Sequence, residues 1–214
     1  MDFYYNSWRL VPANLLWGLG LLGVLFLLLT VPVAAVPAAI FLAVPAVGIF
    51  RLATQIAREE PVSFRDSLHA WRRFLGRALI SGAVLVAISF VMLFNTVLGL
   101  LNPELVLWVI ATMSVWGLLA TWLVAVPYWA LLTDPLREGE PLRAKLRLAA
   151  LLVLVSPLRF SLLLVLIVLV LVTSAIFFAA LLTISVAFVA LLATRYTLPA
   201  ADRLEKRETQ ALPE

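Results

Sequence analysis

The chain has 214 residues and no cysteine, with 64% hydrophobic residues, 13% charged residues and a formal net charge of +4 at pH 7. Soluble domains are roughly 45–50% apolar and about 25% charged, so a chain this short and this apolar cannot present a polar surface to water. The composition, with a mean hydropathy of +1.09, therefore predicts an integral membrane protein. The missing thiols exclude disulfides, thiolate metal sites and cysteine nucleophiles.

Apolar segments of suitable length recur along the chain. A membrane-crossing helix needs about 20 predominantly apolar residues. The pattern predicts an all-α, polytopic transmembrane helical bundle, with six spans at about residues 14–31, 36–53, 78–97, 105–132, 158–173 and 176–195. Asp2 and nearby aromatic residues stand where a signal peptide would have a short basic region, so we expect the first span to be retained.

The last two predicted spans share one uncharged run, from Phe160 to Thr194. As a single helix this run would be about 50 Å long, well beyond a hydrocarbon core about 30 Å thick. We therefore expect a tight turn between Val172 and Phe178. Without that turn the bundle would have five spans.

Prolines interrupt the apolar segments at defined places. Pro32 and Pro37 bracket the position at which the first two spans can reverse direction, so we expect a short hairpin there. Pro45 lies in the second span and Pro127 in the fourth. Each removes a backbone donor and predicts a helix kink.

Two basic segments connect successive spans. Residues 62–77 begin with Ser63 and Asp66 at capping-box spacing, and apolar residues then recur at helical spacing between arginines. This pattern predicts an amphipathic helix lying in the membrane interface on the cytoplasmic side. The second segment, residues 141–160, begins alike and becomes more apolar. The candidate contacts for anionic lipid head groups or for a partner protein are Arg65, Arg72, Arg73, Arg143, Lys145 and Arg147.

Both basic segments follow similar sequences, Arg58-Glu59-Glu60-Pro61 and Arg137-Glu138-Gly139-Glu140-Pro141. Each of these sequences comes after a proline-containing span and precedes another span. Internal duplication and convergent loop chemistry both account for the likeness.

Lysine and arginine fall on one side of the predicted topology. With the N-terminus inside, the inner segments, taken with the ends of the spans as residues 1–13, 51–77, 133–159 and 195–214, hold all sixteen of these residues, and the outer loops hold none. Cytoplasmic loops are enriched in lysine and arginine. We therefore expect both termini, including a polar tail over residues 196–214, on the cytoplasmic side of the cell inner membrane. The basic charge then serves orientation and does not predict nucleic-acid binding.

The sequence contains no pattern typical of catalysis. No ionisable residue lies in the central part of a predicted span, which argues against proton coupling or voltage sensing. His69 is the only histidine, so a metal site of the usual spacing cannot form. No serine–histidine–carboxylate set, zinc signature or phosphate loop occurs. We expect neither enzymatic activity nor a cofactor.

A combination of sequence features over residues 10–85 is typical of one family of membrane proteins. It consists of Asn14 with Trp17, a proline near Pro37 before an alanine-rich second span with an arginine-bearing exit, and a phenylalanine-containing segment over residues 64–77. This pattern resembles the YesL-like family of small bacterial membrane proteins. The resemblance implies a polytopic inner-membrane protein of uncharacterised activity, whose relatives tend to be encoded near carbohydrate uptake and degradation systems. It implies no functional residue.

These features predict a non-enzymatic accessory or assembly partner of a solute transport system, with carbohydrate as the leading solute class. Its partner besides lipid would be a transporter permease or a second copy of the chain. The alternative is a self-sufficient transporter or channel for a small uncharged solute. The residues that would have to converge on a cavity in that case are Ser89, Thr112, Ser114, Thr121 and Tyr128.

Overall fold

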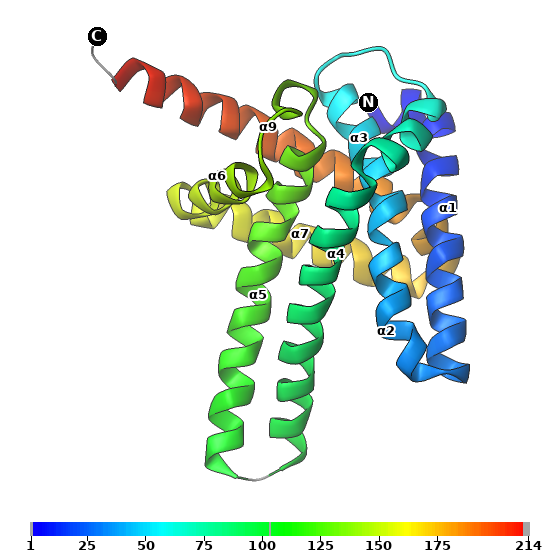
Figure 1. The fold of residues 1–214 in the computed structure, drawn as a ribbon, viewed down its shortest axis with the longest axis vertical. Helices are drawn as coiled ribbons and strands as arrows, with labels where there is room; N and C mark the ends of the chain where they lie inside the picture. Colours follow the sequence, from blue (N-terminus) through cyan, green and yellow to red (C-terminus); the bar gives the residue numbers. More distant parts are fainter. Residues whose placement is uncertain (1, 103, 212–214) are drawn as a thin grey trace.

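The computed structural model describes residues 2–102 and 104–211, and helices make up most of that part of the chain (Figure 1). Pro103, in the predicted outer loop, and the last three residues of the predicted tail lie outside the described residues. The elements in chain order are α1 (Asp2–Thr30), α2 (Pro32–Phe41), α3 (Ala43–Ala57), α4 (Phe64–Leu101), α5 (Leu105–Thr133), η1 (Pro135–Arg137), α6 (Leu142–Val155), α7 (Pro157–Ile176), α8 (Phe178–Ala180), η2 (Leu181–Ser185) and α9 (Val186–Ala211).

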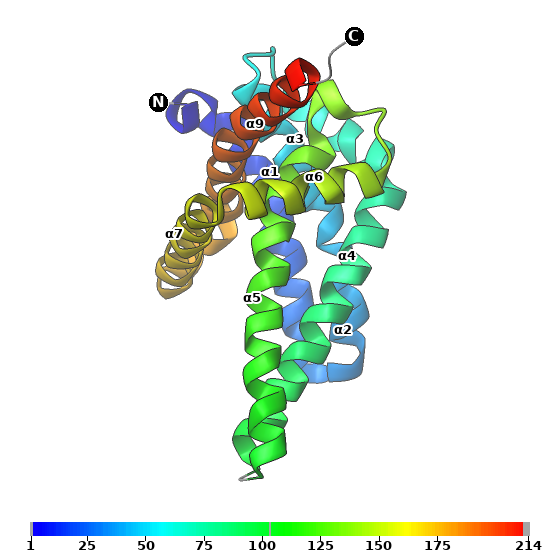
Figure 2. The ribbon, with the colours of Figure 1, turned by 90° about the vertical axis from the view of Figure 1, so that its left-hand side faces the viewer.

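The predicted six-span helical bundle is confirmed, and the chain is a multi-pass membrane protein. The segments long and apolar enough to cross a membrane are Trp8–Thr30, Pro32–Ala57, Phe64–Leu101, Leu105–Thr133, Pro157–Ile176 and Phe178–Lys206. They form three hairpins, made by α1 with α2–α3, by α4 with α5, and by α7 with α8–α9. Figures 1 and 2 show α6 crossing the bundle and α7 inclined to α4 and α5. We call the end at which α3 and α5 end and α4 begins the charged end.

The packed core lies in the half of the bundle nearest the charged end. Val47 of α3, Phe74 of α4, Leu131 of α5 and Ala190 of α9 are almost completely buried there. The far half of the α4–α5 hairpin instead exposes large apolar side chains, including Leu105 at 80% exposure. Continuous apolar exposure of this kind suits lipid, because water would make it an aggregation surface.

Helix α4 runs without interruption through the boundary expected near residue 77. The prediction that residues 62–77 form a helix of their own is therefore wrong, because α4 carries residues 64–77 and the third span as one continuous helix. Nothing there ends a helix: the region contains no proline, and Phe74 and Ala78, one turn apart, are both buried in the core. The basic segment that does form a separate helix is α6, which ends before Pro157 because proline disfavours helical geometry in the preceding residue.

The start of α4 forms as its sequence predicts. Ser63 N donates to Asp66 Oδ2 at 2.7 Å, and Arg65 N donates to Ser63 Oγ at 3.3 Å. These are the reciprocal bonds of a capping box. They satisfy backbone N–H groups that have no partner within the first helical turn.

The prolines act differently from one another. Val31 alone separates α1 from α2, so the predicted bracketing of this hairpin by Pro32 and Pro37 is wrong. Pro32 occupies the first position of α2, where its missing N–H costs no helical hydrogen bond, and Pro37 lies within that helix. Pro45 is the third residue of α3 and cannot donate to the carbonyl four residues earlier, and the second span is interrupted at Leu42, between α2 and α3. Pro127 lies within α5, which continues through it.

The turn between the last two spans is at Phe177, within the predicted range. The chain then forms η2, a short π-helix against α1. Asn14 of α1 is completely buried at this contact. Its Nδ2 donates to Leu182 O at 2.8 Å, and Ala187 N donates to its Oδ1 at 2.8 Å. One side-chain amide therefore supplies partners to two backbone groups, a carbonyl within the π-helix and an N–H in the first turn of α9.

Gly18 brings α1 close to the same backbone. A Cβ at this position would lie 2.5 Å from Leu182 O, so only glycine fits without a shift of the main chain. Asn14 and Gly18 are one turn apart and therefore lie on one face of α1. Together they hold the last hairpin against the first by direct contact with its backbone.

Replacement of Asn14 by leucine tests this contact. Asn14→Leu keeps the branching of the side chain but leaves a carbonyl and a buried N–H without their partner, so we expect a loss of about 3 kcal/mol in the free energy of unfolding. Thermal unfolding in mild detergent measures the change. Asn95→Leu, at a partly exposed position of α4, is the control and should change stability by less than about 0.5 kcal/mol. Equal stability of Asn14→Leu and the wild-type chain would contradict this role.

Candidate functional site

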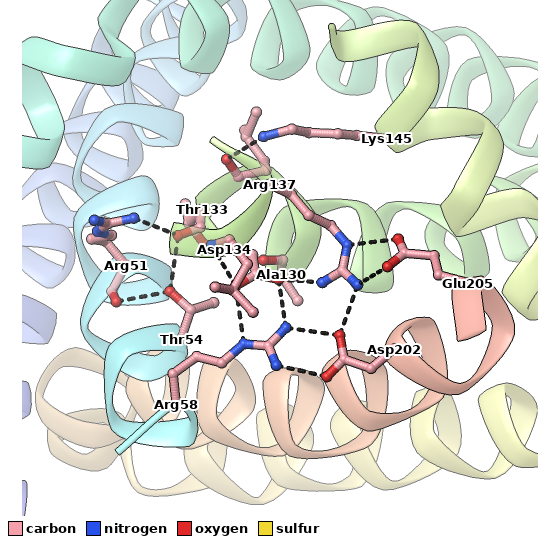
Figure 3. Close-up of polar contacts among 12 residues, drawn as sticks. Arg51, Thr54, Arg58, Ala130, Thr133, Asp134, Arg137, Lys145, Asp202 and Glu205 are labelled. Carbon is pink, nitrogen blue, oxygen red and sulfur yellow. Dashed lines mark hydrogen bonds and ion pairs between the residues drawn. The ribbon is translucent and has the colours of Figure 1, made fainter. Parts of the chain in front are cut away.

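A cluster of ion pairs lies at the charged end, where α3, α5, η1 and α9 meet (Figure 3). Its basic members are Arg58, directly after α3, and Arg137 of η1. Its acidic members are Asp134, directly after α5, and Asp202 and Glu205 of α9. Asp134 is completely buried and Arg137 is 4% exposed. The cluster thus joins all three hairpins through charged groups held largely away from water.

Arg58 binds both aspartates through two hydrogen bonds each. Its Nε donates to Asp134 Oδ1 at 3.1 Å, and its Nη2 donates to Asp134 Oδ2 at 2.8 Å. On its other edge, Nη1 donates to Asp202 Oδ2 at 2.6 Å and Nη2 to Asp202 Oδ1 at 3.0 Å. This paired geometry matches the planar guanidinium to two carboxylates, which a lysine could not do.

Arg137 closes the cluster from the opposite side. Its Nη1 donates to Asp134 Oδ2, and its Nη2 donates to Asp202 Oδ1 at 2.7 Å. It also binds Glu205 through Nε to Oε1 at 2.9 Å and Nη2 to Oε2 at 2.6 Å. Figure 3 shows the two guanidinium groups on either side of the aspartates.

These contacts keep both arginines charged. Hydrogen bonds to Asp202 and Asp134 raise the pKa of Arg58 above its ordinary value. Burial by itself would lower the pKa of Arg137, but its hydrogen bonds to Glu205 and Asp202 outweigh burial and raise it. Every carboxylate oxygen of both aspartates accepts a hydrogen bond from Arg58, so both aspartates are engaged in binding the arginines. The cluster therefore acts as a set of ion pairs that hold the helices together.

The last carbonyls of α5 are satisfied beside the cluster. Thr133 O accepts from Arg51 Nη1 at 3.0 Å and from Thr54 Oγ1 at 3.0 Å. Leu132 O accepts from Lys145 Nζ at 3.2 Å. The final carbonyls of a helix have no partner within the helix and form the negative end of its dipole. Side chains from α3 and α6 therefore supply hydrogen-bond donors to the last carbonyls of α5.

The two similar sequence segments face each other at this site. Thr54 precedes Arg58 by four residues, as Thr133 precedes Arg137. The threonines are joined by a hydrogen bond, and the two arginines share Asp134. Duplication and convergence both account for this arrangement.

Glu138, directly after η1, links α4 to the charged end through ion pairs. Its Oε1 lies 2.6 Å from Arg73 Nε, and its Oε2 lies 4.0 Å from Arg51 Nη2. Its backbone carbonyl accepts from Arg77 Nη1 at 3.0 Å. Arg73, one of the predicted lipid or partner contacts, is therefore paired within the chain although its side chain is 65% exposed.

The other predicted contacts divide into two groups. Arg65, Arg72, Arg143 and Arg147 are exposed, and none of them pairs with a carboxylate within the described residues. Lys145 is completely buried, so the prediction that it contacts lipid is wrong. It lies on the face of α6 that packs against α5, which its alternation with exposed arginines does not reveal.

The hydroxyls of the spans are used locally. Thr112 and Thr121 each donate to the carbonyl four residues earlier in α5, at 2.9 Å and 2.8 Å. Tyr128 shares a hydrogen bond of 2.6 Å with Ser81 of α4. These groups stabilise single helices or the α4–α5 hairpin, and they do not provide the convergent polar set that a solute path would need. Within the described residues, no group of three His, Cys, Asp or Glu side chains could hold a metal ion.

Sequence reasoning did not find the acidic half of the cluster. It places Asp202 and Glu205 in a polar tail, whereas α9 carries both as a continuous helix from the last span. It assigns no role to Asp134. The signal present in the sequence was the shared spacing of threonine and arginine in the two segments, which locates the basic half alone.

Comparisons with known proteins give no match. No family model, curated protein or solved structure is significantly similar to this chain. The resemblance to the YesL-like family therefore stays a prediction, and the function has to be inferred from the site itself.

Lys145 is a buried charge to which no carboxylate of the described residues is bonded. Burial, as the main cause, and the nearby charge of Arg77, as the second, lower its pKa to about 8. An unfolded chain keeps the ordinary value of 10.5. Between these two values the unfolded chain binds more protons than the folded chain, so stability rises with pH there. Below about pH 8 both states are protonated, and the full cost of burying the charge applies.

Lys145→Met tests this cost. The variant removes the buried ammonium, so we expect it to stabilise the protein by about 2 kcal/mol at pH 7. That gain should shrink as the pH rises from 8 to 10.5, because the wild-type amine becomes neutral. Thermal unfolding in detergent at pH 7 and pH 10 gives the comparison, with Lys206→Met as a control at an exposed position. A loss of stability at pH 7, or a gain independent of pH, would contradict the assignment.

Proposed function

We propose that the chain is a non-enzymatic accessory or assembly partner of a solute transport system in the bacterial cell membrane, with carbohydrate as the leading solute class. The contrast between two sets of arginines carries this proposal. Arg58 and Arg137 are neutralised by carboxylates of the chain itself. The other set is exposed, has no such partner within the part of the chain that the structure describes, and consists of Arg65, Arg72, Arg143 and Arg147.

The ion-pair cluster is internal to the bundle, whereas the four exposed arginines form a surface that a partner can contact. The ion-paired layer holds α3, α5 and α9 together, while the exposed arginines lie on α4 and α6 around it. The basic charge of these arginines complements an acidic surface on a partner. The helices that carry them are already ordered, so binding would not have to order the backbone. We therefore assign the four exposed arginines to the contact with a permease or its ATPase.

The distribution of basic residues supports a cytoplasmic position for this surface. All sixteen lysines and arginines lie in segments that the positive-inside rule places in the cytoplasm. In that orientation both termini and the charged end face the cytoplasm. The surface would then meet the parts of a transport system that work on that side.

The alternative, a self-sufficient transporter or channel, has less support. Three of the five residues that would have to converge on a solute path instead bond to their own helix or across the α4–α5 hairpin. A path through the bundle would need these groups to be turned toward a common space.

Affinity purification in mild detergent from native membranes tests the proposal. We expect the tagged chain to recover a permease or its ATPase in stoichiometric amount, and expect this recovery to be lost in Arg65→Glu/Arg72→Glu or in Arg143→Glu/Arg147→Glu. The matched control is Arg203→Glu/Lys206→Glu, which reverses two exposed charges on α9 and should leave recovery unchanged. Recovery of the chain alone, together with solute flux through liposomes that contain only this chain, would contradict the proposal and establish the alternative.

A further inference from the structure

An amphiphilic groove lies where α6 ends, α7 begins and α9 passes. Its volume is about 640 Å³. One part is polar, with Ser156, Arg159 and Tyr196, and the other is apolar, with the side chains of Leu158, Leu162 and Leu166. These residues belong neither to the ion-pair cluster nor to the four exposed arginines described above.

Arg159 is held in place at the polar part. Its Nη2 donates to Tyr196 O at 3.1 Å, and its guanidinium lies 5.4 Å from the centre of the Tyr196 ring. Both contacts come from one residue of α9, so the cation is oriented without being neutralised. No carboxylate within the described residues pairs with Arg159. An oriented guanidinium of this kind presents a planar set of donors that matches a phosphate.

The apolar part extends from this cation along the membrane span. Leu158, Leu162 and Leu166 recur every fourth residue and so form one stripe on α7, about 12 Å long. Leu158 and Leu162 are 73% and 61% exposed, so the stripe is open to its surroundings. The first residue of the fifth span is Pro157. The polar part therefore lies at the entry of the span, and the stripe leads into the apolar region.

We propose that this groove binds an anionic glycerophospholipid, with its phosphate at Arg159 and Ser156 and an acyl chain along the leucine stripe. Charge complementarity selects this occupant, because a free cation stands at one end of an otherwise apolar groove. Tyr196 suits the same position, since tyrosine places an apolar ring and a polar hydroxyl at a membrane surface. The proposal does not depend on the docking role of the four exposed arginines.

Lipid titration of the purified full-length chain tests the site. The delipidated protein in detergent is titrated with dioleoylphosphatidylglycerol or dioleoylphosphatidylcholine, and bound lipid is counted by native mass spectrometry. We expect phosphatidylglycerol to bind about tenfold more tightly than phosphatidylcholine. Arg159→Gln should remove that preference. Equal binding of the two lipids by the wild-type chain would overturn the proposal.

Two further variants separate this site from general attraction to a basic protein. Arg203→Gln removes the same charge from an exposed position of α9 and should leave the affinity for phosphatidylglycerol unchanged. Leu162→Trp fills the groove without changing its charge and should weaken binding of both lipids. An equal loss in Arg159→Gln and Arg203→Gln, or no loss in Leu162→Trp, would overturn the proposal.

Two checks complete the test. Each variant should keep the thermal unfolding midpoint of the wild-type chain, so that a binding loss reports the groove, and Leu162→Trp gives a second reading if Arg159→Gln does not fold. Glycerol 3-phosphate at the concentration of the lipid should not displace it, because the acyl chain supplies part of the affinity. Displacement would show an anion site alone and would overturn the lipid assignment.

Discussion

Asp134 is a completely buried carboxylate that follows the longest helical hairpin of the bundle, and its charge has to be compensated within the protein. Arg58 brings the end of α3 to it, and Arg137 brings η1. Both arginines also bind Asp202, which fixes α9 to the same point. Loss of one partner from a buried pair costs about 3–5 kcal/mol, because the other charge stays buried. The three hairpins are therefore tied at one end by a single requirement for charge balance.

Backbone groups impose the same requirement inside the membrane. Without water, a polar group has to find its partner in the protein, and Asn14 does this for two backbone groups next to η2. Together with Gly18 it joins α1 to the last hairpin. The first and third hairpins therefore contact each other at two places, the ion pairs around Asp134 and the contact of Asn14 and Gly18 with η2. Among the described residues, the far half of the α4–α5 hairpin has no comparable polar contact, and its apolar side chains face outward.

The features that sequence predicted well are local ones. The six spans, the turn near Phe177 and the capping box at Ser63 depend on composition, length and spacing over a few residues. Hydropathy failed at residue 77 because it marks where a chain enters lipid, whereas α4 continues through that boundary. The ion cluster could not be predicted in full, since Arg58 meets Asp134 and Asp202 from 76 and 144 residues away. Only folding brings these charges together.

The coupling between Arg58 and Asp202 tests this account most directly, because their contact links the first hairpin to the third. A double-mutant cycle with Arg58→Gln and Asp202→Asn, followed by unfolding in detergent, measures it. The account predicts that the double variant loses less stability than the two single losses added together, with a coupling free energy above about 1 kcal/mol. Single losses that add to within about 0.5 kcal/mol would contradict it, because independent sites behave in that way.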